Sequence, residues 1–215
     1  MITYKLTNKD RITRNGTLWE IGKANTTDGR GGLCGPGWLH CYEHPLLAVL
    51  HDPIHGAFGE SARMFRCEAG GKILKDGQMK MGCAELTPIE EIPLPSVTTI
   101  QRISYAIHCA QCVYHDQEWN EWANNWLSGE DRTFAATWAA AAAATWAAAD
   151  VAEWSARAAA AAAARAADAA ARWAAAEADV AEWSVRAAAA DAAAWSVAKE
   201  TNLISCAEKG VKIEK

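Results

Sequence analysis

The chain has 215 residues, with 21 basic against 26 acidic side chains and a net charge of −5. This length supports one good hydrophobic core or two smaller ones. No lysine occurs between Lys80 and Lys199, so no basic stripe can follow a phosphate backbone, and we expect no nucleic-acid partner. Alanine is weakly hydrophobic and the alanine-rich part also carries charges, so a run of about 20 strongly apolar residues is missing and we expect no membrane span.

The N-terminal part is predicted to be rich in strands. Short strands are expected at 3–7 and 17–23, joined by the turn Arg14-Asn15-Gly16, because Asn-Gly tolerates positive φ. A glycine-rich loop follows at 26–37. The first residues lack the charged and apolar regions of a signal peptide. Since the seven cysteines are odd in number and scattered, we expect reduced thiols in a cytoplasmic protein.

A second β segment is predicted after a short helix. The helix is expected at 45–50, and Asp52-Pro53 should end it, because the residue before proline disfavours the α region. Strands are expected at 63–68 and 80–86, joined by a turn at 70–77. The β-rich part then closes at Pro93-Leu94-Pro95.

Two helices are predicted next. The first begins after an N-cap at Thr98 or Thr99 and runs to about His115, with one apolar face. The second covers 116–127 and carries three tryptophans at helical spacing: Trp119, Trp122 and Trp126.

An alanine-dominated segment follows, with 38 alanines in the 64 residues 135–198. Alanine has the highest helix propensity, so we expect helix here. The octet 150–157 returns at 179–186, and a charged stripe along one face predicts one continuous helix over 150–186, with breaks near Asp150 and Asp191. We expect this segment to fold as a hairpin or bundle.

The predicted fold class is therefore α+β. A small β-rich domain at 1–97 is followed by connecting helices at 98–129, an Ala/Trp-rich helical region at 130–201 and a C-terminal tail at 202–215.

Two interpretations apply to the tryptophans of the helical region. They can be wedges in the core of the hairpin or bundle. They can also be exposed anchors for a protein partner, because tryptophan is enriched in binding hot spots. The anchors that we would choose lie in or beside the charged stripe: Trp154, Trp183, Glu153, Arg157, Glu182 and Arg186.

The set His108-Cys109-x-x-Cys112-x-x-His115 has two interpretations as well. Cys109, Cys112 and His115 lie near one helical face and could converge on zinc. Alternatively, the two cysteines are small apolar residues of a helix core. We expect the second interpretation, with no bound metal and no cofactor.

A second group of polar residues surrounds His40 and Tyr42. His51 and His55 would share a helical face, but Pro53 lies between them. Glu85 and Glu90 are carboxylates that could act as a general base. The sequence contains no catalytic triad signature, P-loop, dinucleotide fingerprint or HExxH motif. We therefore favour a protein that is not an enzyme.

The segments Gly35-x-Gly37-Trp38-x-His40, Pro45-Leu46-x-Ala48-Val49-Leu50 and Arg63-Met64-Phe65-Arg66-Cys67-Glu68-Ala69-Gly70-Gly71 carry a resemblance. The chain resembles a family of uncharacterised, mostly phage-encoded proteins over residues 1–110, and loosely in the alanine-rich part. The resemblance implies a phage or prophage origin, an accessory role in an infected bacterial host, and no catalytic residues to transfer.

The glycine-histidine turn, small helix and β-hairpin are also similar to ADP-ribosyltransferase folds. That resemblance implies that His40, Tyr42 and either Glu85 or Glu90 would handle NAD. The chain lacks the Ser or Tyr motif of the second strand in those folds.

We accordingly expect a non-enzymatic phage-type accessory protein that acts by protein–protein interaction, as an inhibitor of a bacterial defence system. One alternative is a degenerate NAD- or ADP-ribose-binding, transferase-like domain with a helical oligomerisation tail. Another is a structural protein that self-assembles through its helices into a homo-oligomer.

Overall fold

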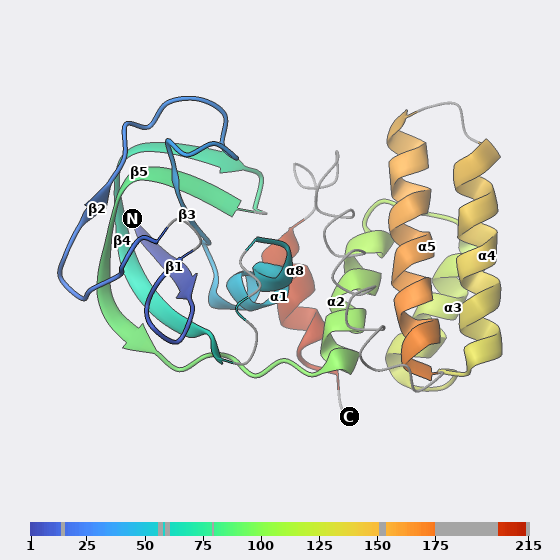
Figure 1. Ribbon diagram of the computed structural model, residues 1–215. Helices are drawn as coiled ribbons and strands as arrows, with labels where there is room; N and C mark the ends of the chain where they lie inside the picture. The colour runs from blue at the N-terminus through green and yellow to red at the C-terminus, as the bar shows by residue number, and fades with distance from the viewer. Residues whose placement is uncertain are drawn as a thin grey trace. The chain divides into compact units, whose positions relative to one another are not determined.

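The computed structural model describes residues 1–13, 16–55, 58, 61–78, 80–150, 154–174 and 202–213. The chain divides into two compact units, Met1–Ser96 and Val97–Lys215. The first unit holds an antiparallel sheet with one helix, and the second holds helices (Figure 1). The α+β class predicted from the sequence is thereby confirmed.

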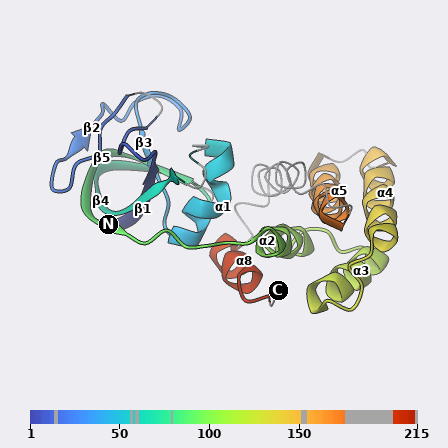
Figure 2. The same ribbon diagram turned by 60° about the horizontal axis from the view of Figure 1, so that its bottom comes forward.

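The sheet of the first unit has five strands in the order β1-β4-β5-β2, with β3 also paired to β5. Every pairing is antiparallel. The strands are β1 (Ile2–Thr7), β2 (Asn25–Thr26), β3 (Leu39–Cys41), β4 (Arg63–Asp76) and β5 (Lys80–Ile92). The ribbon formed by β4 and β5 is long and strongly curved (Figures 1 and 2).

Backbone pairing after β3 closes this sheet on itself. The amide of Tyr4 in β1 donates to the carbonyl of Tyr42 at 2.8 Å, and the amide of Tyr42 donates back at 2.9 Å. Because β1 pairs with β4, β4 with β5 and β5 with β3, these two bonds complete a ring. Its interior is apolar, with a cluster of Trp19, Leu39, Cys41, Phe65, Cys67, Ala69, Met81, Cys83 and Leu86.

The ring explains why the predicted strand at 17–23 was wrong. One edge of β1 is occupied by β4 and the other by Tyr42, so no edge remains for a hairpin partner. Within 17–23 only Leu18 makes a bridge, to Ile12. Arg14 and Asn15 of the predicted turn lie outside the described residues.

The predicted turn at 70–77 was also wrong, because β4 continues through residues 70–76 and pairs with β5 there. Gly71 has a φ of +65°, and the register shifts between Gly70 and Ile73. A β-bulge of this kind bends a strand without ending it. The turn of the hairpin instead follows Asp76, where β4 ends, and β5 then reaches Ile92, just before Pro93.

Helix α1 (Pro45–His55) extends beyond the predicted stop at Asp52-Pro53. A proline removes one backbone hydrogen bond of a helix and strains the preceding turn. Pro53 lies two residues from the end of α1, so few helical bonds depend on it. His51 and His55 therefore belong to one uninterrupted helix.

The second unit contains five described helices: α2 (Thr99–Gln111), α3 (Gln117–Ser128), α4 (Phe134–Asp150), α5 (Trp154–Ala174) and α8 (Leu203–Gly210). The starts of α2 and α3 agree with the prediction, since Thr98 forms a capping box with Gln101 and Asp116 accepts from the Trp119 amide at 2.8 Å. No helix among the described residues has the length and apolar content needed to cross a membrane.

Helices α2 to α5 share one core in which alanine faces meet three indole rings. The rings of Trp119, Trp122 and Trp126 come from α3 and are buried. The alanines come mainly from α4 and α5, which lie side by side (Figure 1). Alanine allows helix backbones to approach closely, and the indoles supply the apolar area that alanine lacks.

The break predicted near Asp150 is confirmed, and the helix predicted to start at residue 150 starts a few residues later. Asp150 is the last residue of α4, and α5 starts at Trp154. A helix without a break from α4 into α5 would leave in water the alanine faces that these two helices bury against each other, so burial favours the break near Asp150. The second octet at 179–186 and the predicted break near Asp191 lie outside the described residues.

Candidate functional site

His40 and Tyr42 lie at β3 and serve the closure of the sheet. The Nε2 atom of His40 makes a short hydrogen bond with the carbonyl oxygen of Leu33. Burial lowers the pKa of His40 below its usual 6.5, and the positive charges of Lys5 and Lys80 add to this effect. Tyr42 is buried, and its ring centroid lies 6.0 Å from that of His51.

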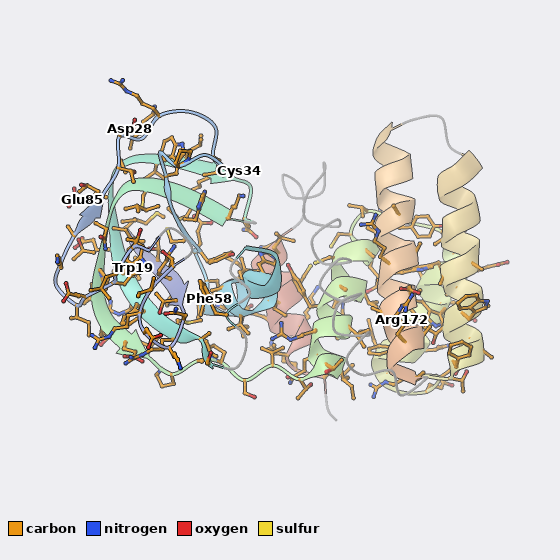
Figure 3. The ribbon with its side chains drawn as sticks, viewed as in Figure 1. Trp19, Asp28, Cys34, Phe58, Glu85 and Arg172 are labelled. Atoms are coloured by element: carbon orange, nitrogen blue, oxygen red, sulfur yellow. The ribbon has the colours of Figure 1, made fainter. Side chains whose placement is uncertain are left out.

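Glu85 and Glu90 lie elsewhere on β5. Glu85 is exposed on the outer side of the sheet, near β2, with which it pairs through Thr26 (Figure 3). Glu90 accepts a hydrogen bond from the Nε atom of Arg66 at 2.5 Å. His40 pairs with Gly82, and Glu90 is eight residues further along the strand. At about 3.3 Å per residue, such a separation is far beyond hydrogen-bond reach.

The structure therefore does not gather these four residues into one site. A general base must lie within hydrogen-bond reach, about 3 Å between heavy atoms, of the group whose proton it abstracts. Glu90 is committed to Arg66, and the His40 ring is turned to a backbone carbonyl. The arrangement favours structural roles for these side chains.

Lys5 occupies an uncommon position for a lysine. Its Nζ atom donates to the His40 carbonyl at 2.6 Å and lies 4.9 Å from the centre of the Trp19 ring. Burial lowers the pKa of Lys5, while three nearby thiols oppose that shift: Cys41, Cys67 and Cys83. A cation held over an indole face in a partly dry site is stabilised by the ring. Lys5 thereby ties β1 to β3.

The thiols beside Lys5 do not behave alike. The hydrogen bond from Cys83 lowers the pKa of Cys41, whereas burial raises the pKa of Cys67 to about 12. The hydrogen bond with Cys41 and burial both raise the pKa of Cys83. All three side chains are buried, so we interpret them as core residues, in line with the inertness of buried cysteines.

The candidate metal set at the end of α2 is spread over different environments. Cys109 is buried, His115 is exposed, and Cys112 is exposed at the helix C-cap. Burial lowers the pKa of His108, although a hydrogen bond with Gln111 opposes that shift. Among the described residues, no three His, Cys, Asp or Glu side chains converge as metal ligands do.

The structure adds a third cysteine that the sequence did not associate with this set. The Sγ atom of Cys206, in α8, lies 3.8 Å from the Sγ atom of Cys112. Cys109 and Cys206 are also hydrogen-bonded. The sequence contains no signal for this contact, since 94 residues separate Cys112 from Cys206.

Most of the predicted partner-binding residues lie outside the described part of the chain. This applies to Glu153, Trp183, Glu182 and Arg186. Trp154 and Arg157 belong to the first turns of α5, but their side chains are not described. An i,i+4 ion pair lies further along α5, with 2.9 Å between Arg172 Nε and Asp168 Oδ2 (Arg172 is labelled in Figure 3).

An exposed aromatic pair on α4 was missed by sequence reasoning. Phe134 and Trp138 are 47% and 58% exposed, and their rings stack with centroids 6.0 Å apart and planes 22° from parallel. The available signal was the i,i+4 spacing of two aromatics in a helix without a charge between Phe134 and Ala149. We name Phe134 and Trp138 the α4 aromatic pair.

The comparisons with known proteins concern the first unit. Residues 1–100 match a family model described as a domain of unknown function, DUF7666. This segment contains the whole closed sheet and ends at the start of α2. The search of curated proteins and the search of solved structures gave no match.

Proposed function

We propose that this protein acts by binding another protein and not by catalysis, with α4 as the contact surface. In this proposal it is a phage-type accessory protein that inhibits a bacterial defence system. The phage origin and the accessory role rest on the resemblance carried by residues 1–110. The defence target rests on the acidic charge balance and on the lack of a catalytic signature in the sequence. The contact surface rests on the α4 aromatic pair.

The exposure of the α4 aromatic pair is the observation that carries the proposal. Complete burial of a phenylalanine or tryptophan removes roughly 150–250 Å² of surface from water, and about half of each side chain of the pair is exposed and available for this. Their mutual stacking restricts both rings before binding, which lowers the entropy cost of complex formation. Trp138 is of the residue type most often found as a binding hot spot.

The chemistry of α4 also defines the partner. The helix carries no charged side chain before Asp150, and its residues between the aromatics and that end are alanine, threonine and tryptophan. Docking this face therefore desolvates no charge up to Asp150. We infer a protein partner with an apolar groove that accepts one helix face, the mode of recognition used by helix-in-groove complexes.

A site-specific cross-link in bacterial cells tests this proposal. A photo-cross-linking amino acid at position 138 of the full chain should give one discrete protein adduct, identified by mass spectrometry. The same amino acid at position 21 is the matched control, since Ile21 is an exposed apolar residue (54%) of the first unit. The Phe134→Ala/Trp138→Ala variant, tagged at a terminus, should lose the same partner.

The outcomes separate the alternatives. An adduct of twice the chain mass would identify a second copy and support self-assembly, contradicting a foreign partner. Equal adducts at positions 138 and 21 would contradict the assignment of α4. The alternative of NAD or ADP-ribose binding is not supported by the positions of His40 and Glu90, because the two residues lie far apart. A thermal-shift measurement with NAD and with ADP-ribose tests this alternative directly.

A further inference from the structure

Helices α2 and α8 pack against each other in antiparallel directions. At one end, the Nε2 atom of Gln101 donates to the carbonyl of Val211 at 2.7 Å. One turn further along α2, Tyr105 lies against Gly210. The N-terminal half of α8 therefore reaches the C-terminal end of α2, where Cys109 and Cys112 are found.

This packing places two thiols within reach of a covalent bond. The Sγ atoms of Cys112 and Cys206 are 3.8 Å apart, whereas a disulfide requires about 2.05 Å. The remaining distance of about 1.8 Å is small compared with the arc that a cysteine sulfur covers on rotation about χ1. Cys112 is exposed at the end of α2, while Cys206 is only 4% exposed.

We propose that Cys112 and Cys206 form an oxidation site for small hydroperoxides. The Cys112 thiolate attacks one oxygen of hydrogen peroxide, the O–O bond breaks, and hydroxide leaves as Cys112 becomes a sulfenic acid. The Cys206 sulfur then attacks the Cys112 sulfur, and the sulfenic oxygen leaves as water with the Cys206 proton. Two thiols supply two electrons, and one peroxide becomes two waters.

The environments of the two thiols support this order of events. Only Cys112 is open to a peroxide in solution, because Cys206 is buried. The hydrogen bond with Cys109 and burial raise the pKa of Cys206 to about 12, although its hydrogen bond with Cys112 opposes them. Cys206 therefore remains a thiol until the neighbouring Cys112 sulfur has been oxidised, and it then forms the disulfide with that sulfur. The nearby positive charge of Lys209 favours ionisation of the Cys206 thiol.

Cys34 provides a natural comparison in the same chain. It is the other exposed cysteine among the described residues, and the Nζ atom of Lys80 lies 3.1 Å from its sulfur. The group beside the Cys34 sulfur among the described residues is therefore the Lys80 ammonium group and not a second thiol. Oxidation of Cys34 should therefore proceed without an internal disulfide.

The disulfide would covalently join α8 to the end of α2. Residues 113–205 would then form a closed loop that contains α3, α4 and α5. This inference rests on the α2–α8 contact alone and does not depend on the proposed function.

Peptide mapping after hydrogen peroxide treatment tests the site. The reduced full chain is oxidised, unfolded, alkylated and digested with trypsin. Cleavage places Cys206 on 200–209 and both Cys109 and Cys112 on 103–132. We expect these two peptides to be linked within the monomer, with a loss of about 2 Da that dithiothreitol reverses. The Cys34→Ser variant should give the same link.

The variants decide the assignment. Cys112→Ser, a change at an exposed position, should abolish the link. Cys206→Ser should leave Cys112 to accumulate as sulfenic or sulfinic acid. A link that persists in Cys112→Ser would assign the bond to Cys109 and overturn the proposal. Recovery of Cys112 in the wild-type chain as a free thiol or a sulfinic acid, without a link, would also overturn it.

Discussion

Gly210 of α8 lies so close to Tyr105 of α2 that a side chain at position 210 has no room. A Cβ atom added to Gly210 would stand 2.9 Å from the Tyr105 backbone nitrogen and 3.0 Å from its Cα atom. Backbone atoms of a helix cannot yield as the end of a flexible side chain can. This contact sets the distance between the two helices, and with it the position of Cys206.

The first prediction concerns this contact. Gly210→Ala should lower the free energy of unfolding by about 1–3 kcal/mol, the usual cost of overpacking a tight interface. Urea denaturation followed by circular dichroism measures it. Gly32→Ala is the control, because nothing lies within 4 Å of the added Cβ atom there. Equal free energies of unfolding for Gly210→Ala and the wild type would contradict the prediction, because they would show that α2 and α8 can move apart without a loss of stability.

The second prediction separates buried from exposed tryptophans. Trp126 is fully buried in the helical core, whereas Trp138 is 58% exposed. Trp126→Ala should cost about 3–5 kcal/mol of stability, as for a large core side chain. Trp138→Ala should change stability by less than about 0.5 kcal/mol, as for a surface position. Thermal unfolding of both variants checks the contrast, and a large loss in Trp138→Ala would contradict the exposure of the α4 aromatic pair.

The third prediction addresses the start of α2. The Thr98 side chain accepts a hydrogen bond from the Gln101 backbone amide. The Gln101 side chain in turn accepts a hydrogen bond from the Thr98 backbone amide, with a donor–acceptor distance of 2.9 Å. Thr98→Ala should therefore cost about 1 kcal/mol. Thr99→Ala, one position into the helix, should cost less, because alanine is the better helix former there. The midpoints of urea unfolding compare them, and the reverse order would place the cap elsewhere.

The fourth prediction is a pH dependence. Burial lowers the pKa of His108 below 6.5 in the folded chain. Below pH 6.5 the unfolded chain therefore binds a proton that the folded chain does not, so the free energy of unfolding falls as the pH is lowered. The loss ends once the pH passes the folded-state pKa, because both states are then protonated.

Unfolding measured at a series of pH values checks this dependence. His108→Gln should reduce the slope between pH 6.5 and the folded-state pKa of His108. An unchanged slope in His108→Gln would mean that another group carries the dependence.

Part of the candidate surface was visible in the sequence and part was not. Two tryptophan-bearing octets drew attention to residues 150–186, whereas the described exposed aromatics lie earlier, at Phe134 and Trp138. Helical spacing shows which residues share a face, but it does not show which face a neighbouring helix covers. The alanines of α5 cover one side of α4, and only their packing left Trp138 in solvent.

The sequence by itself determined the features of the fold that depend on local interactions. The N-cap at Thr98, the Asp116 cap, the left-handed Gly129 after α3 and the helicity of α4 and α5 each depend on contacts within a few residues. Such contacts form without the rest of the chain, so their residues alone specify them.

Only the tertiary structure decided which distant segments meet. The partner of β1 lies some sixty residues away, and Cys206 lies 94 residues from Cys112. These pairings are selected by burial, by the strand edges that remain free and by close approach at positions such as Gly210. No periodicity in the sequence records them, because the free energy that selects them arises only when the segments are packed together.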